Sequence, residues 1–165
     1  MRVETQKHDQ WCWAAIAVSI SQYYEKQASP WTQCMLANRE LGMAADCCVE
    51  GDSCNTSWYL ERALNRVGHY REYRKLVPTS SQFPLIKQEL DSGRLPCVRV
   101  SWRKSTEGHF LLITGYITDH QNGRWREFLD VSDPRYGSDT RTLEYSHLMS
   151  RYRSIGVWTH TYLTL

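Results

Sequence analysis

The chain lacks any apolar run long enough to cross a bilayer, and its first ten residues, MRVETQKHDQ, lack the hydrophobic stretch of a secretory signal peptide. It also lacks a marked charge of one sign, because 20 Lys and Arg stand against 18 Asp and Glu. We therefore expect no membrane span, no signal peptide and no nucleic-acid partner. Internal repeats and low-complexity tracts are missing too, and a hydrophobic content of 41% is typical of a folded globular protein.

The length of 165 residues suits a single domain covering residues 1–165. Helical spacing of apolar residues predicts four helices, at 13–24, 31–42, 56–68 and 81–93. For the second helix, Ser29 before a proline is the expected cap and Gly42 the expected end. For the third helix, either Thr56 or Ser57 is the expected cap.

From Leu95 onward, β-branched and aromatic runs of strand length replace the helical pattern. These runs cover 95–103, 108–119, 125–133, 140–145 and 157–165. A short helix is expected at 146–152, before the last strand. Helices followed by an antiparallel sheet predict an α+β fold. The basic residues Arg71, Arg74 and Lys75 are interpreted as a solvated helix end or loop rather than a phosphate site.

The cysteine count is high for this length. The six are Cys12, Cys34, Cys47, Cys48, Cys54 and Cys97. With Cys12 set aside, five remain, and these cannot all pair within one chain. Three alternatives stay open for them: one or two disulfides in an oxidising compartment, buried free thiols, or a metal site. The adjacent Cys47 and Cys48 do not form the paired C-x-x-C hooks of zinc sites, so no metal and no other cofactor is predicted.

The segment QKHDQWCWAAIAVSISQYY places Cys12 between two tryptophans at the start of the first predicted helix. By itself such a thiol is more often a packed core residue than a nucleophile. A nucleophilic cysteine needs its thiolate form, which a helix N-terminus favours, and a histidine that shares the proton. His109, at the start of the apolar run HFLLITGY, is the candidate, and Gly108 before it is expected to leave room for substrate. Four aromatic residues are interpreted either as cleft lining or as core: Trp11, Trp13, Trp102 and Phe110.

A third group must orient the imidazole, and hydrogen-bond donors must meet the developing oxyanion. Asp133, at the end of the next predicted strand, is the candidate for the first role because neighbouring strands bring it toward His109. Asp130 competes for that role, but strand alternation directs its side chain elsewhere. The backbone N–H of Cys12 and the side-chain amide of Gln6 are the candidate oxyanion donors.

These motifs resemble those of papain-like cysteine peptidases. They are Gln6 followed by Cys12-Trp13, then GHF with an apolar strand, then Asp-Pro with a downstream glycine. WCWAA, GHFLLITGY and SDPRYG are most similar to the compact bacterial branch, which includes the C39-like peptidases and the papain-like effector proteases of plant pathogens. The resemblance runs from Gln6 to the C-terminus. It implies a papain-like fold, in which the nucleophile helix packs on an antiparallel sheet or half-barrel.

Carried over by position, the resemblance implies Cys12 as nucleophile, His109 as general base and then acid, Asp133 as the orienting group, and Gln6 as part of the oxyanion hole. Three features depart from papain itself. The Cys-to-His spacing is shorter than the roughly 130–150 residues of papain and cathepsins. Aspartate stands where papain has asparagine, and no Gly-Ser pair precedes the cysteine.

The expected function is that of a cysteine endopeptidase acting on a protein substrate through an acyl-thioester, and the C39-like resemblance favours cleavage after Gly-Gly. Glutamine deamidases and transglutaminases use the same constellation, so these activities stay open. A catalytically silent binding module and a disulfide-stapled structural domain are further alternatives. The absence of a signal peptide and of an inhibitory prosegment suits a toxin or effector domain of a larger bacterial secreted protein. Such a domain would be delivered by a signal-independent secretion system, and otherwise be cytoplasmic, with a cognate inhibitor or immunity protein as partner.

Overall fold

The computed structural model describes residues 1, 3–26, 28–76, 81–137 and 139–165. Its helices are α1 (Cys12–Tyr24), α2 (Gln33–Leu41), α3 (Leu60–Arg66), α4 (Phe83–Asp91) and α5 (Tyr145–Arg151), with the 3-10 helix η1 (Gly51–Cys54). Its strands are β1 (Glu72–Lys75), β2 (Cys97–Trp102), β3 (Gly108–Gln121), β4 (Arg124–Ser132), β5 (Thr140–Glu144) and β6 (Gly156–Leu163). The fold is therefore α+β, as the sequence predicts.

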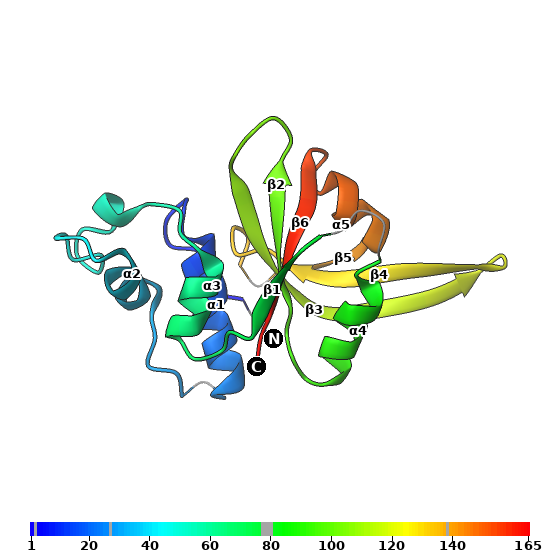
Figure 1. Cartoon of the computed structure of the whole chain (residues 1–165), viewed down its shortest axis with the longest axis horizontal. Coiled ribbons are helices and arrows are strands. Elements are labelled where there is room, and N and C mark those ends of the chain that lie inside the picture. The colour runs from blue at the N-terminus through cyan, green and yellow to red at the C-terminus, as the bar shows by residue number, and fades with distance from the viewer. Residues whose placement is uncertain (2, 27, 77–80, 138) are drawn as a thin grey trace.

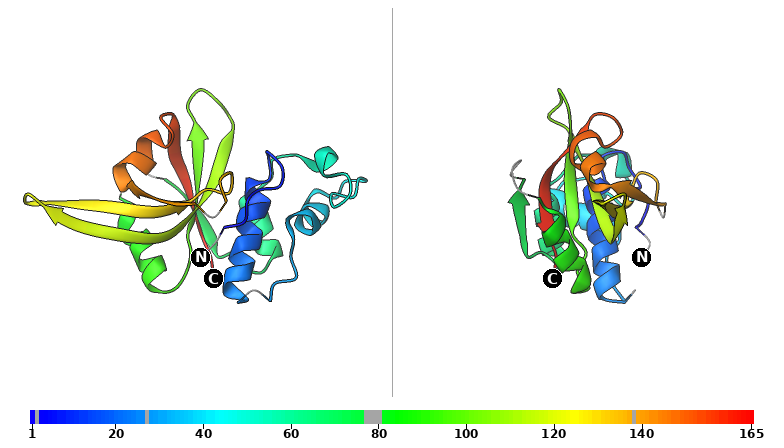
Figure 2. Two further views of the ribbon diagram at one scale, coloured as in Figure 1. Left: turned by 180° about the vertical axis from the view of Figure 1, so that it is seen from behind. Right: turned by 90° about the vertical axis from the view of Figure 1, so that its right-hand side faces the viewer.

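The sheet divides the molecule. Within the described residues it is six-stranded, with the order β1-β6-β2-β3-β4-β5 and antiparallel pairing throughout. Helices α1, α2 and α3 lie on one side of it, and the long β3–β4 hairpin projects away from them (Figures 1 and 2). The turn of this hairpin is Asn122-Gly123, with φ of 51° and 74°, as expected for an Asn-Gly turn.

The central strands β2 and β3 are apolar on both faces because both faces are covered. Cys97 and Leu112 join the cluster formed with α1, α2 and α3. Val98 and Leu111 join a second cluster, to which α4 and α5 contribute Phe83, Ile86 and Leu148. These strands therefore read as nearly continuous hydrophobic runs instead of alternating ones. Two cores result, one on each face of the sheet.

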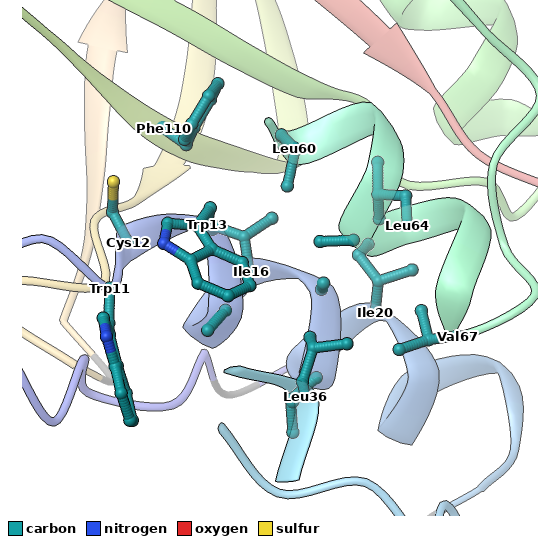
Figure 3. Close-up of a cluster of buried hydrophobic side chains, with 14 of the residues drawn as sticks. Trp11, Cys12, Trp13, Ile16, Ile20, Leu36, Leu60, Leu64, Val67 and Phe110 are labelled. Carbon is teal, nitrogen blue, oxygen red and sulfur yellow. The ribbon is translucent and has the colours of Figure 1, made fainter. Parts of the chain in front are cut away.

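Helix α1 is the centre of the first core (Figure 3). Its first ten residues, Cys12 to Ser21, are all buried. The small side chains of Ala14, Ala15 and Ala17 leave room for neighbouring elements, while Ile16 and Ile20 fill the space toward α2 and α3. A helix that is apolar on all sides is expected in the interior.

Two of the predicted helix caps are wrong. Helix α2 is capped by Thr32, whose Oγ1 accepts a hydrogen bond from Met35 N at 3.3 Å, whereas the Ser29 hydroxyl instead bonds the Ser21 hydroxyl at 2.7 Å. Its C-terminal end is as predicted, with Gly42 in the left-handed conformation at φ 56°. Helix α3 begins later than predicted, at Leu60, and has no side-chain cap.

Two of the three basic residues expected in a helix end or loop, Arg74 and Lys75, instead belong to an edge strand. Strand β1, which contains Arg74 and Lys75, pairs with β6. Just before it, Arg71 forms an ion pair with the buried Glu89 of α4, with 2.8 Å between Nη2 and Oε1. Arg74 forms an ion pair with Glu72 at 2.8 Å. Two of the three charges therefore have structural partners.

Of the three readings of the cysteines, the structure shows two disulfides together with buried free thiols. Cys34 is bonded to Cys48, and Cys47 to Cys54, which ties α2 and η1 into one stapled segment. Cys12 and Cys97 are free. Burial raises the pKa of the Cys97 thiol far above its usual range, so it stays protonated. Two disulfides are typical of a protein that works in an oxidising environment. None of the helices in the described segments is long and apolar enough to span a membrane.

Candidate active site

Cys12 is the first residue of α1 and lies at the wall of a groove of about 920 Å³. The groove runs between the helices and the sheet, and its lining includes Cys12, residues 55–59, Gly108 and Phe110. The side chain of Cys12 points away from the apolar cluster that surrounds Trp13 (Figure 3). Its residual exposure of 7% is therefore on the groove side.

The two tryptophans beside Cys12 fix the start of its helix. Trp11 and Trp13 are fully buried, and their indole N–H groups donate to the carbonyls of Cys54 at 2.8 Å and Thr56 at 3.1 Å. Cys54 is one half of the Cys47–Cys54 disulfide, and Thr56 follows it closely in the chain. Of the aromatic residues expected in the cleft or core, Trp11 belongs to the core, and Trp13 and Phe110 belong to the core and also line the groove.

His109 and Asp133 form a buried pair. His109 is the second residue of β3, and Asp133 follows the last residue of β4. The Nε2 atom of His109 lies 2.6 Å from Oδ1 of Asp133, so Nε2 carries a proton and donates it to the carboxylate. This leaves Nδ1 as the ring nitrogen available to interact with Cys12, which also helps to raise the pKa of His109.

These contacts set the charges of the site. Burial alone would lower the pKa of His109, but the hydrogen bonds to Asp133 and Cys12 outweigh it and raise this pKa to about 9. Burial would likewise raise the pKa of Asp133, and the hydrogen bond and charge of His109 together with Tyr152 hold it below its usual value. At neutral pH the pair is therefore an imidazolium and a carboxylate.

No model of a known protein family matches the chain, and no curated protein matches it. Its function is therefore inferred from the geometry of the site and from the resemblance of the motifs. No group of three or more metal-ligating side chains occurs in the part of the chain that the structure describes.

The carboxylate of Asp133 has further donors that the sequence did not indicate. Its Oδ2 accepts a hydrogen bond from the Tyr152 hydroxyl at 2.6 Å, and its Oδ1 accepts one from Arg135 N at 2.9 Å. Arg153 Nε lies 3.6 Å from the same Oδ2. Trp102 stacks between His109 and Tyr152, with 6.4 Å between ring centroids on each side. Tyr152 and Trp102 thus enclose the pair. Trp102 was expected in the cleft or core, whereas nothing in SRYRS signals the role of Tyr152.

The competing carboxylate lies elsewhere. Asp130 accepts a hydrogen bond from the Thr142 hydroxyl at 2.6 Å, and its side chain faces Gly115. A Cβ placed on Gly108 would lie 2.6 Å from Cζ of Arg99. Gly108 thus makes room for the Arg99 guanidinium, and it also lines the groove.

Gln6 lies in the loop before α1 and is tied to the Asp133 region. Its backbone N–H donates to Pro134 O at 2.8 Å. Its side-chain Nε2 donates to the carbonyls of His8 at 3.0 Å and Asp9 at 2.7 Å, and its Oε1 is buried without a partner in the described part of the chain. Both amide hydrogens are therefore engaged, and one must be released before Gln6 can bind an oxyanion. The backbone N–H of Cys12 is at the first position of α1, where no intrahelical acceptor exists.

Proposed function

We propose that this protein is a cysteine endopeptidase with Cys12 as nucleophile, His109 as acid and base, and Asp133 as the orienting carboxylate. The observation that carries the proposal is the buried, hydrogen-bonded pair of His109 and Asp133, whose imidazole interacts with Cys12 at the wall of a large groove. Thiol catalysis requires a nucleophile, a histidine and an orienting group, and these three residues supply them. The resemblance to papain-like peptidases supports the same roles and a papain-like fold.

The first half of the reaction forms an acyl-enzyme. The Cys12 thiolate attacks the carbonyl carbon of the scissile peptide, forming the C–S bond and moving the carbonyl π electrons onto oxygen. When the tetrahedral intermediate collapses, the C–N bond breaks, and His109 gives its Nδ1 proton to the leaving amine. Asp133 remains a carboxylate and keeps the ring in place through Nε2.

The second half returns the enzyme to its starting state. His109, now neutral, removes a proton from water, and the resulting hydroxide attacks the thioester carbonyl. The C–S bond breaks, which releases the carboxylic acid and restores the thiolate beside the imidazolium. In both halves the Cys12 N–H is the resident oxyanion donor, and Gln6 joins it if its amide turns from the carbonyls of His8 and Asp9.

The broader role is proposed from the motifs. The C39-like resemblance supports cleavage after small residues such as Gly-Gly. The two disulfides fit delivery to an oxidising compartment or the exterior. We propose a toxin or effector domain of a larger bacterial protein, restrained by a cognate inhibitor or immunity protein.

Deamidation and transglutamination share the first thioester, so the deciding experiment must read the product. Wild type, Cys12→Ala and His109→Ala are incubated with a proteome-derived peptide library and a glutamine-rich protein, and the products are analysed by mass spectrometry. His120→Ala is the matched control, because His120 is exposed and lies in the projecting hairpin far along β3 from His109. Peptidase activity gives new termini with wild type and His120→Ala only. A gain of about one dalton or a cross-link without new termini would assign the alternatives, and equal turnover by Cys12→Ala would overturn the proposal.

A further inference from the structure

The groove contains a cation that the proposed reaction does not use. Arg99 lies in β2, opposite Phe110 of β3 and His160 of β6. Residues that oppose each other in antiparallel strands project from the same face of the sheet. Arg99 is half-buried and lines the same groove as Cys12.

The guanidinium of Arg99 is held only by neutral acceptors. Its Nη1 donates to the hydroxyl of Ser101, and its Nη2 donates to the carbonyl of Thr106 at 3.3 Å. A longer contact of 3.4 Å joins Nη1 to Thr159 Oγ1. Among the described residues, no carboxylate forms an ion pair with Arg99. A partly desolvated charge without a counterion favours an anion supplied from outside.

The position of the guanidinium places this charge close to the reacting centre. Its Cζ, Nε and Nη2 lie 2.6–2.7 Å from the point where a Gly108 Cβ would stand. Gly108 immediately precedes His109 in β3. A carboxylate bound by Arg99 would therefore lie next to Gly108, in the same groove that Cys12 lines.

Arg99 is the one Arg or Lys among the described residues that line the groove. The pKa of His160, which also lines it, is lowered, first by burial and then by the positive charges of Arg99 and Lys75. Two carboxylates, Glu61 of α3 and Glu107 before β3, line the groove as well, but in the segments that the structure describes neither forms an ion pair with Arg99. A negative side chain in the groove would therefore be attracted to the Arg99 guanidinium itself.

We infer that Arg99 binds an acidic side chain of the substrate, so that the enzyme selects protein segments with Asp or Glu close to the scissile bond. The inference rests on the proposed peptidase function and specifies its substrate class. A planar guanidinium with fixed donors matches a carboxylate better than a neutral amide of the same shape. An acidic residue outside a Gly-Gly pair is compatible with cleavage after small residues.

The test compares Glu with Gln at each position near the cut. Cleavage sites are first mapped in a proteome-derived peptide library, and matched Glu and Gln peptides are then assayed one at a time. For wild type we expect kcat/KM to favour Glu over Gln by about tenfold or more at one position, as for a hydrogen-bonded charge pair. Arg99→Met should bring this ratio close to one. Arg103→Met is the control, because the exposed Arg103 side chain donates to the Ser150 carbonyl and does not line the groove.

A charge reversal and a binding assay complete the test. Arg99→Glu should prefer Lys over Gln at the same position, and a ratio of two substrates does not depend on how much of a variant is folded. Cys12→Ala, with and without Arg99→Met, is assayed for binding to an array of Glu and Gln peptides. If wild type cleaves without a Glu preference, or Arg99→Met keeps that preference, the inference fails and the peptidase proposal stands. If no variant cleaves, an Arg99-dependent Glu preference in binding supports the inference, and equal binding overturns it.

Discussion

The Nε2 atom of His109 lies 2.6 Å from Oδ1 of Asp133, and both side chains are almost completely buried. Each group stabilises the charged form of the other, because the pKa of His109 is raised and that of Asp133 is lowered. Removing either partner leaves the other as an uncompensated charge in a low-dielectric environment. We therefore expect the pair to control the pH dependence of folding and, in the proposed mechanism, the reactivity of Cys12.

Substituting Asp133 separates its charge from its hydrogen bond. Asp133→Asn keeps an acceptor for His109 Nε2 but removes the negative charge, so the alkaline limb of kcat/KM should move below its wild-type position of about pH 9. Asp133→Ala removes both, and kcat should fall by about a hundredfold or more through loss of ring orientation. The measurement is the pH profile of kcat/KM for a single peptide. An alkaline limb that stays in place in Asp133→Asn would show that the charge does not act on His109.

Tyr152 is expected to act through Asp133. Tyr152→Phe removes the 2.6 Å hydrogen bond to Oδ2, which should lower the free energy of unfolding by about 1–3 kcal/mol. The carboxylate, with one donor fewer, becomes more basic, so the alkaline limb should move upward while KM changes little. Tyr136→Phe is the control, because the Tyr136 ring contacts the same Arg153, while Tyr136 bonds Asp133 only through its backbone N–H, which the substitution keeps. A loss of stability with an unchanged pH profile would reduce Tyr152 to a structural role.

The free energy of unfolding should depend on pH through His109. Its folded pKa of about 9 lies above its unfolded value of about 6.5, so the folded state holds a proton that the unfolded state releases in between. The stabilisation of the folded state by this proton is complete below about pH 6.5. It is lost as pH rises through about 9, which lowers the free energy of unfolding by up to about 3 kcal/mol. Urea unfolding between pH 6 and 10 should show the decline in wild type and a flatter curve in His109→Ala. Parallel curves would contradict the assignment.

The two disulfides should differ in their effect on activity. Removing either disulfide by a pair of Cys→Ser substitutions should lower the free energy of unfolding by about 2–4 kcal/mol. The loss should be at least as large for Cys34–Cys48, which closes the longer loop, as for Cys47–Cys54. Only the Cys47–Cys54 pair adjoins the carbonyl that binds Trp11, so its removal should also lower kcat/KM of the folded protein. Activity assays well below the unfolding midpoint test this. If both variants lose kcat/KM to the same extent, the loss follows from reduced stability and not from the position of the Cys47–Cys54 disulfide.

Much of the fold follows from the sequence because period and length are local signals. The apolar runs from Leu95 onward become β2, β3, β4, β5 and β6 within a few residues of their expected bounds. Strand β1 was missed because its four residues, EYRK, have little apolar character and owe their extended form to pairing with β6. Ser29 and Thr56, which were predicted to cap helices, do not cap them for a similar reason. Tertiary partners such as Ser21 and Trp13 engage those segments before a helix can begin.

The residues of the candidate site were likewise predictable from the sequence only in part. Cys12, His109 and Asp133 were predicted because a helix start, a strand start and a strand end each carry a sequence signal. Tyr152 and Arg99 were not, because their roles depend on which face of the folded sheet they reach. The meeting of Gln6 with the His8 and Asp9 carbonyls is likewise a property of loop geometry, which no spacing rule describes.

The central claim is that His109 activates Cys12, and the rate of alkylation of Cys12 by iodoacetamide tests it most directly. Modification is followed by mass spectrometry from pH 5 to pH 9 in wild type and His109→Ala, with Cys97, which is fully buried, as the internal control for unfolding. We expect His109→Ala to be alkylated at Cys12 at least about tenfold more slowly than wild type at pH 6, because the thiol has lost the imidazole that shares its proton. Equal rates in the two proteins at pH 6 would contradict the account.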